Sequence, residues 1–272
     1  MDYSEQGRLV TAFRSAEVLV KDDFVEKGLS GSGRDQEPLS RLLDSSGARL
    51  PESISEQALN GDLLGKLYDK ETEAPAGWAW VPLRSFLTIL HERDWFRTSK
   101  LLAYLNWRYN SNFCGRCGSK NGDKSDEVAR LCPKCGNLTF PRISPAILAV
   151  VSRGDKLLLA RNAMNKMKSW SILAGFVEPG ETFEGCVKRE IKEEVNIEVQ
   201  TDCYLGSQPW PFPDQLMLGF SAHWVSGELQ PDKVEIAEAG WFGPEELPPL
   251  PGPGSLSRRL IDGFFNGSLG KK

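Results

Sequence analysis

The chain has 272 residues, a length that supports two domains or one large one. Its composition, 40% hydrophobic and 26% charged, is ordinary for a globular protein and excludes wholly disordered, collagen-like and coiled-coil proteins. A net charge of -4 provides no strong positive field to attract nucleic acid or an anionic membrane. We therefore expect a folded protein that holds any polyanionic ligand locally, through metal ions.

The sequence has no pattern that indicates a membrane span or secretion. The chain starts MDYSEQGRLV, without a basic segment or an apolar run. Its longest apolar stretch, PAILAVV, is far shorter than the roughly 20 residues of a membrane span. We expect a cytoplasmic protein with no cleaved signal and no contact with a membrane.

The N-terminal part carries weak patterns of secondary structure. Short strands are expected at 16–20 and 77–83, separated by a polar stretch in which residues 31–40 form a loop. Residues 85–109 place leucines and aromatic residues at mixed spacings of three and four, which predicts an amphipathic helix or a pair of helices. His91 is predicted to be a partly exposed helix residue rather than a ligand or a base.

Four of the six cysteines form two Cys-x-x-Cys-Gly knuckles. Each knuckle turns the backbone so that both thiolates approach one ion, and the glycine that follows tolerates positive φ. Four thiolates without a nearby histidine favour a closed tetrahedral zinc site, which is structural rather than catalytic. Two disulfides or a redox dithiol are the alternatives. The predicted zinc ligands are Cys114, Cys117, Cys132 and Cys135.

The same region also raises the question of nucleic-acid binding, which is common among zinc ribbons. Its basic side chains, among them Lys120 and Lys124, are diluted by acids such as Asp123, so a brace between domains is the favoured interpretation. The remaining cysteines, Cys186 and Cys203, lack metal-like spacing and are predicted to be small buried residues.

After the cysteines the pattern changes to short strands and turns. A β-hairpin is expected over 146–161 and a further strand over 171–178. Thr182 is placed to cap a helix whose apolar stripe faces a sheet. The stripe consists of Phe183, Val187, Ile191 and Val195. The later elements are strands at 203–210, 215–225 and 237–242 and, after a proline-rich connection, a helix at 255–265.

The polar side of this helix concentrates carboxylates. Glu190 and Glu194 are four residues apart on one face, with Glu193 beside them, and Glu181 enters from the preceding loop. Like charges at this spacing repel, unless Arg189 and divalent cations neutralise them. Mg²⁺ or Mn²⁺ bound there would align a diphosphate and lower the pKa of an attacking water. A solvated acidic helix face is the alternative.

The spacing of this segment resembles the Nudix box: Gly, five residues, Glu, seven residues, Arg-Glu-aliphatic-x-Glu-Glu, then x-Gly-aliphatic. The match starts at Gly175, and Asn196 replaces the last glycine, which asparagine can do because it tolerates a left-handed helix end. The segment from Ser207 to Pro213 and the four-cysteine ribbon narrow the resemblance to the NADH pyrophosphatase branch. Members of this branch also remove NAD caps from RNA.

The resemblance implies an α+β protein with three parts. These are an N-terminal α/β domain over 1–110, a zinc ribbon over 111–140, and a Nudix α/β/α sandwich with a mixed sheet over 141–272. It also implies a homodimer that cleaves the diphosphate of NADH or NAD⁺, giving nicotinamide mononucleotide and AMP. On NAD-capped RNA the same cleavage would leave a 5′-monophosphate.

Two other functions remain open. One is a Nudix hydrolase of ADP-ribose or dinucleoside polyphosphates. The other is a zinc-ribbon RNA-binding protein with a non-catalytic Nudix fold, although the four box glutamates favour an enzyme.

The resemblance further implies individual site residues. The candidate catalytic residues are Glu190, Glu193 and Glu194. The catalytic Mg²⁺ or Mn²⁺ would be held by the backbone carbonyl of Ala174 and by Glu190, Glu194 and Glu235. The substrate-binding positions are Arg84, Glu127, Phe140, Phe176, Gln208, Pro209, Trp210, Pro211, Phe212, Pro213, Asp214, Gln215 and Ser257.

Two of these positions depart from the family, and two aromatic positions lie between prolines. Phe140 replaces a frequent tyrosine, and Asp214-Gln215 stands where x-Ser is usual. The prolines of this segment stiffen the backbone around Trp210 and Phe212, whose rings would stack on a base for about 1–3 kcal/mol each. Spacing alone equally allows both rings to be core residues at a sheet edge, and the resemblance favours stacking.

Overall fold

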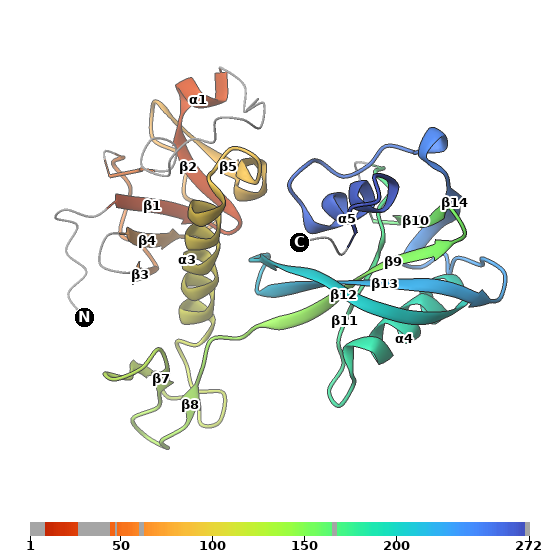
Figure 1. The fold of residues 1–272 in the computed structure, drawn as a ribbon. Coiled ribbons are helices and arrows are strands. Elements are labelled where there is room, and N and C mark those ends of the chain that lie inside the picture. Colours follow the sequence, from red (N-terminus) through yellow and green to blue (C-terminus); the bar gives the residue numbers. More distant parts are fainter. Residues whose placement is uncertain (1–8, 27–43, 47, 60–62, 165–167, 270–272) are drawn as a thin grey trace. The chain divides into compact units, whose positions relative to one another are not determined.

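The computed structural model describes residues 9–26, 44–46, 48–59, 63–164 and 168–269 (Figure 1). The chain forms two compact units. The first unit is Met1–Ile143 with Pro211–Asp214, and the second is Ser144–Trp210 with Gln215–Lys272. The finer division at residues 110 and 140 stays a prediction. Within the described ranges, no helix is both long and apolar enough to cross a membrane.

The first unit is built on a five-stranded sheet in the order β3-β4-β1-β2-β5. β1 and β4 pair in parallel and the other neighbours are antiparallel, so the sheet is mixed. The strands are β1 (Leu9–Arg14), β2 (Glu17–Lys21), β3 (Ser55–Leu59), β4 (Leu63–Tyr68) and β5 (Trp78–Pro82).

Two strands of this sheet confirm the predictions at 16–20 and 77–83. The other three, and the short helix α1 (Asp22–Glu26), were not expected. β4 shows why: five of its six residues are buried, so its sequence lacks the alternation that marks a half-buried strand. The loop predicted at 31–40 lies outside the described residues.

The segment 85–109 forms one long helix preceded by a short turn of 3₁₀-helix. α3 (Glu92–Asn110) begins after His91, an exposed residue with non-helical backbone angles, while η1 covers Leu83–Phe86. The predicted amphipathic helix is thus confirmed from residue 92 onward. Leu101 is fully buried against Gly65 of β4, where a Cβ would come within 2.5 Å of the leucine Cγ. The missing side chain therefore lets the helix pack closely on the sheet.

The zinc ribbon adds a small three-stranded antiparallel sheet, in the order β6-β7-β8, to the first unit. Gly118 and Gly136, the residues that follow the two knuckles, both have φ of 71°, as the sequence predicted. The strands are β6 (Gly122–Asp123), β7 (Arg130–Leu131) and β8 (Leu138–Thr139).

The second unit contains a six-stranded mixed sheet in the order β12-β13-β9-β10-β14, with β11 paired to β9. Only β9 and β13 pair in parallel among the neighbours of this sheet. Every strand predicted after residue 140 is confirmed. The strands are β9 (Ser144–Arg153), β10 (Lys156–Asn162), β11 (Leu173–Phe176), β12 (Glu198–Trp210), β13 (Gln215–Ser226) and β14 (Ile236–Phe242).

The central strand β9 separates two cores. Ile147, Ala149 and Val151 belong to the core under α4 (Phe183–Val195), whereas Leu148 and Val150 belong to the core that includes α5 (Leu256–Phe265). This alternation follows from the two-residue period of a strand. A short η2 (Pro244–Glu246) precedes the proline-rich connection. The second unit is therefore the expected α/β/α sandwich with a mixed sheet (Figure 1).

Helix α4 begins and ends as predicted. Thr182 Oγ1 accepts a hydrogen bond from the Gly185 N–H at 3.1 Å, and Asn196 ends the helix in the left-handed conformation, with φ of 58°. One member of the apolar stripe is not buried as the others are. Phe183, in the first turn of the helix, is 40% exposed and contacts the ring of Phe220.

The two unpaired cysteines behave differently. Cys186 is fully buried under α4, as predicted. The prediction for Cys203 is wrong, because it is exposed on β12, the edge strand of the sheet, beside a shift in register. A short apolar side chain at an edge strand lacks the second layer that would cover it.

Candidate functional site

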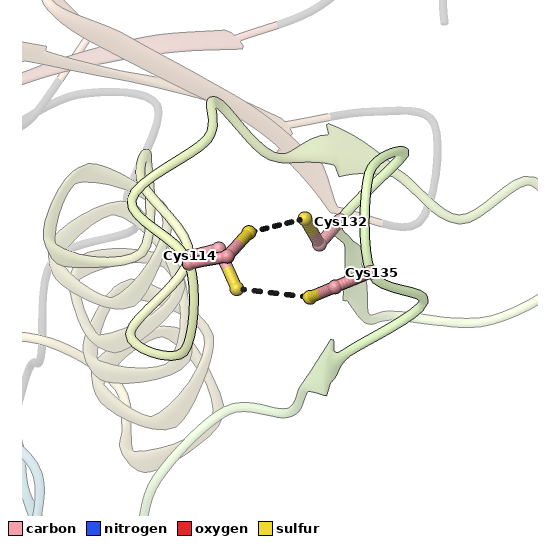
Figure 2. A group of neighbouring side chains, drawn as sticks. Cys114, Cys132 and Cys135 are labelled. Carbon is pink, nitrogen blue, oxygen red and sulfur yellow. Dashed lines mark hydrogen bonds between the residues drawn. The ribbon is translucent and has the colours of Figure 1, made fainter.

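Two groups of side chains have the geometry of metal sites. The first is the four-cysteine group of the ribbon, whose sulfur atoms all lie within 4.8 Å of one another (Figure 2). The Sγ atoms of Cys114 and Cys135 are 3.6 Å apart, and those of Cys117 and Cys132 are 3.5 Å apart. Tetrahedral zinc with Zn–S bonds of about 2.3 Å requires a separation of about 3.8 Å. The four thiols are free, so the disulfide alternative fails and the cluster fits structural zinc.

Backbone donors prepare two of these thiols to bind a cation. A hydrogen bond from the Arg116 N–H lowers the pKa of Cys114, and one from the Ser119 N–H contributes most to lowering the pKa of Cys117 to about 6. The thiolate is the form that binds zinc, so the local backbone favours metal binding before the ion arrives.

We expect Cys117→Ser to reduce the bound zinc from about one ion per chain and to lower the melting temperature. Because the site is closed, the variant protein that stays folded should keep most of its Mg²⁺- or Mn²⁺-dependent activity. Metal analysis and thermal melting check this, with Cys203→Ser as the matched control for loss of an exposed thiol. A zinc-free wild-type protein of full stability would contradict the prediction.

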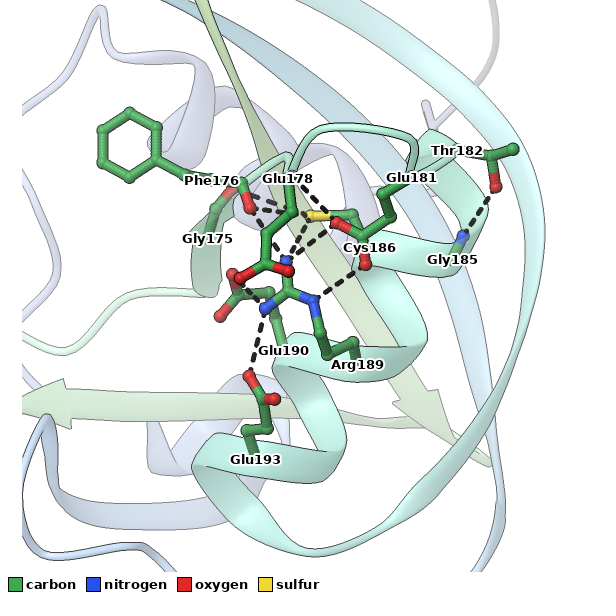
Figure 3. Close-up of polar contacts among 10 residues, drawn as sticks. All are labelled: Gly175, Phe176, Glu178, Glu181, Thr182, Gly185, Cys186, Arg189, Glu190 and Glu193. Atoms are coloured by element: carbon green, nitrogen blue, oxygen red, sulfur yellow. Dashed lines mark hydrogen bonds and ion pairs between the residues drawn. The ribbon is translucent and has the colours of Figure 1, made fainter.

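The second group lies on and around α4, and Arg189 is at its centre (Figure 3). The guanidinium donates to both carboxylate oxygens of Glu181, at 2.8 and 2.9 Å, to Glu190 at 2.9 Å and to Glu193 at 3.0 Å. It also donates to the backbone carbonyl of Phe176 at 2.9 Å. The sequence predicted that Arg189 helps to neutralise these acids, and the structure joins it to three of them.

These contacts fix the protonation of Glu181. The hydrogen bonds from Arg189 are the largest cause that lowers the pKa of Glu181, to about 2. Glu181 also accepts from the Glu178 N–H at 3.1 Å, which closes the loop before the helix. Glu181 therefore acts as an anchor between the loop and α4, by way of Arg189.

Gly175 explains how Glu190 reaches the sheet. A Cβ at Gly175 would lie 1.9 Å from Cδ of Glu190, so the carboxyl group occupies the space that a side chain on β11 would need. The first glycine of the motif thus places this carboxylate beside the strand that contains Ala174. Burial is the main cause that raises the pKa of Glu190.

Glu194 is the most buried acid of the group, with 6% of its surface exposed. Its Oε2 has no hydrogen-bond partner among the described residues. Burial is the largest cause that raises its pKa to about 8, followed by the charges of Glu190, Glu235, Asp232 and Glu193. A buried, unpartnered carboxylate among other acids is costly unless a cation binds there.

Glu235 joins these acids through a loop that is tied to the end of α4. Asp232 N–H donates to the Glu194 carbonyl at 3.0 Å, and Gln230 N–H donates to the Val195 carbonyl at 3.0 Å. The Asp232 carboxylate in turn accepts from the N–H groups of Val234, Glu235 and Ile236 at 2.8–3.2 Å. The sequence did not single out Asp232, although an aspartate three residues before Glu235 suits a turn.

We expect Asp232→Ala to weaken Mn²⁺ binding about tenfold or more, because Glu235 loses the turn that holds it. Asp232→Asn keeps an oxygen that can accept the same N–H groups, so it should recover most of the affinity. Calorimetric titration of each variant with Mn²⁺ checks this. Equal loss in both variants would show that charge, and not the turn, is responsible.

The donor set fits a hard divalent cation. Glu190, Glu194 and Glu235 influence one another electrostatically, and they offer oxygen ligands only. Oxygen ligands of this kind suit Mg²⁺ or Mn²⁺, since such ions keep several waters and take further oxygens from phosphate.

The predicted substrate positions are divided between the two units. Arg84 is exposed in η1, and Glu127 is exposed and paired with Lys124 at 3.0 Å. Phe140 belongs to the first unit, and Phe176 of the second unit ends β11. Both rings are about half exposed and so are accessible to a ligand. Ser257 Oγ lies 2.6 Å from Ser171 Oγ.

Residues Gln208 to Gln215 form the end of the hairpin between β12 and β13. Gln208 is buried, and its amide donates to the Gly254 carbonyl and accepts from the Leu256 N–H, so it fastens the start of α5. Phe212 packs against the core of the first unit and so occupies a core position, the alternative to stacking. The others are half-buried Trp210, exposed Pro209 and Pro213, buried Pro211, and half-buried Asp214 and Gln215.

Comparison with known proteins finds two domain families in the chain. Residues 142–262 match the NUDIX domain model, and residues 110–140 match the NADH pyrophosphatase zinc ribbon domain model. A crystal structure of a Nudix hydrolase from Nitrosomonas europaea is 25% identical, with a TM-score of 0.46, over 50% of this chain and 80% of that one.

Two relatives are similar over most of their length. The NAD-capped RNA hydrolase NudC of Pseudomonas aeruginosa (strain LESB58) is 46% identical over 198 residues, which cover 71% of this chain and 69% of that protein. The NAD-capped RNA hydrolase NudC of Stutzerimonas stutzeri (strain A1501) is 40% identical over 85% of this chain and 88% of that protein. The chain therefore belongs to the Nudix hydrolase family, in the NudC branch that carries an NADH pyrophosphatase zinc ribbon.

Proposed function

We propose that the chain hydrolyses the diphosphate bond of NAD(H), giving nicotinamide mononucleotide and AMP, and removes NAD caps from RNA to leave a 5′-monophosphate. The reaction type rests on one observation, the buried carboxylate of Glu194 with its unpartnered Oε2 among four other acids. The choice of substrate rests on the relatives of 46% and 40% identity, which are NAD-capped RNA hydrolases.

Some residues of the acidic site would bind cations, and others stabilise its structure. Glu190, Glu194, Glu235 and the backbone carbonyl of Ala174 would hold Mg²⁺ or Mn²⁺. When bound, such ions spread the negative charge of a diphosphate and lower the pKa of an attacking water. Glu193 is 61% exposed on the same helix, where it can accept a proton from water. Arg189 and Glu181 keep the loop and the helix in register.

The proposed nucleotide contacts come from both units. Phe176 and Phe140 are each about half exposed and suit a flat base. The other proposed contacts are Arg84, Glu127, Ser257 and the residues Pro209 to Gln215 other than Phe212, whose ring packs against the core of the first unit. Gln208 has an indirect role, because its side-chain amide already binds the backbone at Gly254 and Leu256.

A panel of substrates tests the function. Turnover of NADH, NAD⁺, ADP-ribose and NAD-capped RNA at equal concentration is compared with Mg²⁺ and with Mn²⁺, with chelator as the control. We expect NAD-capped RNA and NADH to exceed ADP-ribose by about tenfold or more, which is roughly 1.4 kcal/mol of barrier. A preference for ADP-ribose or a dinucleoside polyphosphate would favour the other Nudix activity. No turnover of any substrate would favour the non-catalytic binding protein.

We further infer a homodimer in the cytoplasm. Four free thiols gathered for zinc suit a reducing compartment. Sedimentation should give about twice the chain mass of 30.2 kDa, as in the branch that the sequence resembles. A fully active monomer at micromolar concentration would remove the dimer from the proposal.

A further inference from the structure

The ribbon carries cations that its own acids do not neutralise. Asp123 pairs with Arg108 at 2.8 Å and with Arg130 at 2.5 Å. Lys124 pairs with both Asp126 and Glu127. The acids expected to offset Lys120 are therefore engaged with other partners.

Four exposed basic side chains remain around the knuckles. In the part of the chain that the structure describes, none of them forms a side-chain ion pair or hydrogen bond. Arg116 and Lys134 lie in the two knuckles. Lys120 lies in the bridge with Phe113, and Arg142 follows β8.

A cavity in the first unit brings one of these cations together with an exposed ring. The cavity has a volume of about 460 Å³, and its walls include Arg142, Phe113, Asn137 and Thr139. The backbone of Phe113 pairs with that of Lys120, which places this second cation next to the cavity wall. The Phe113 ring is 66% exposed, which is unusual for so large an apolar group in a folded protein.

The cavity wall combines the donors and acceptors that a nucleotide needs. Arg142 can bind a phosphate, and Phe113 offers a face for a base. The hydroxyl of Thr139 and the amide of Asn137 can bind a ribose 2′-hydroxyl, which only RNA has. Asp214 also lines the cavity, and a carboxylate there can accept from a hydroxyl or a base amino group.

We propose that this ribbon surface, formed by Phe113, Lys120, Asn137, Thr139 and Arg142, binds the single-stranded RNA chain that follows the cap. The proposal rests on the proposed function, because only a capped RNA carries such a chain. It assigns the ribbon a second task besides bracing the fold. Free NADH has no nucleotides beyond the two that its diphosphate joins, and it does not use this surface.

The test removes two cations without touching the carboxylate site. The double variant Lys120→Gln and Arg142→Gln is compared with the matched variant Lys70→Gln and Lys156→Gln, which removes two other exposed cations. Binding of an uncapped RNA of about ten nucleotides is measured by fluorescence anisotropy at several salt concentrations with chelator present. The slope of log affinity against log salt should become shallower by about 1.4, at about 0.7 per phosphate contact.

Turnover provides the second readout. The ribbon variant should raise KM for NAD-capped RNA about tenfold and leave NADH hydrolysis within about twofold of the wild type. Wild-type RNA affinity and salt slope in the ribbon variant would overturn the proposal. If the double variant melts early, Lys120→Gln alone should change the slope by about 0.7, and no change there would also overturn it.

The two proposals fail in different ways. A protein that binds RNA through the ribbon but cleaves none of the panel substrates refutes the proposed function and keeps this inference. A protein that cleaves NADH and NAD-capped RNA equally well with and without the ribbon cations keeps the function and refutes the inference. Restoring both charges, as Lys120→Arg with Arg142→Lys, should recover most of the RNA affinity.

Discussion

Glu194→Gln should reduce turnover of NADH by at least about a hundredfold while leaving the fold intact. The change keeps the size and the helix propensity of the side chain but removes an anionic oxygen from the cation site. A hundredfold loss corresponds to roughly 2.7 kcal/mol of barrier. Steady-state kinetics at saturating Mg²⁺ or Mn²⁺ check this. Near wild-type turnover in both Glu194→Gln and Glu190→Gln would show that neither carboxylate is a central ligand or base.

The same substitution should stabilise the protein when divalent cations are removed. The pKa of Glu194 in the folded protein is about 8, above its ordinary value of 4.5. Between these two pH values the folded state therefore binds more protons than the unfolded state. The stability that protonation of Glu194 contributes is lost as the pH rises through about 8. Glutamine has no such dependence. With chelator, the variant should melt above the wild type at pH 8.5 and close to it near pH 5.

A control separates burial from charge in this experiment. Glu193 is on the same helix but is 61% exposed, so Glu193→Gln should change the melting temperature little at either pH. Adding Mn²⁺ should raise the melting temperature of the wild type more than that of Glu194→Gln. The opposite order would show that Glu194 is not a ligand.

Gly175→Ala should reduce turnover about a hundredfold through one methyl group. The new Cβ would overlap the Glu190 carboxyl group, which must move, and a displacement of about 1 Å in a catalytic group can cost that much. Gly175 does not have positive φ, so alanine adds no backbone strain. The effect should appear in kcat and in Mn²⁺ affinity.

A second glycine provides the matched control. Gly243 lies in the same unit, has φ of -88° and has open space around it. Gly243→Ala should therefore leave turnover and the melting temperature close to those of the wild type. Equal damage by both substitutions would mean that the loss at Gly175 is not specific to Glu190.

The second unit was predictable from sequence because its patterns are local. Thr182 and Asn196 mark the two ends of α4 by their own backbone preferences, and alternation marks the strands. In the first unit, β1 and β4 pair across about fifty residues of chain, and their residues are buried on both faces. Such strands lack the alternation of polar and apolar residues that marks a strand in the sequence. Their place in the sheet depends on pairing with distant segments, which a local pattern does not reveal.

The site shows the same limit at the level of side chains. The motif spacing identified the acids. It did not predict the burial of Glu194, which the loop at Asp232 contacts, or the hydrogen bond by which Gln208 holds the start of α5. Cys203 was placed by residue type alone, and its surroundings, an edge strand, decided the outcome.

The contacts of Arg189 have a further consequence for the chemistry of the site. A guanidinium has five N–H groups, and the hydrogen bonds to Phe176, Glu181, Glu190 and Glu193 use all of them, with a further contact from Nη2 to Cys186 Sγ at 3.5 Å. Lysine has three N–H groups on a single nitrogen and cannot reproduce this set. The arginine therefore keeps no free donor for a phosphate, and its role is structural. The diphosphate must be bound by other groups, or one of these hydrogen bonds must break first.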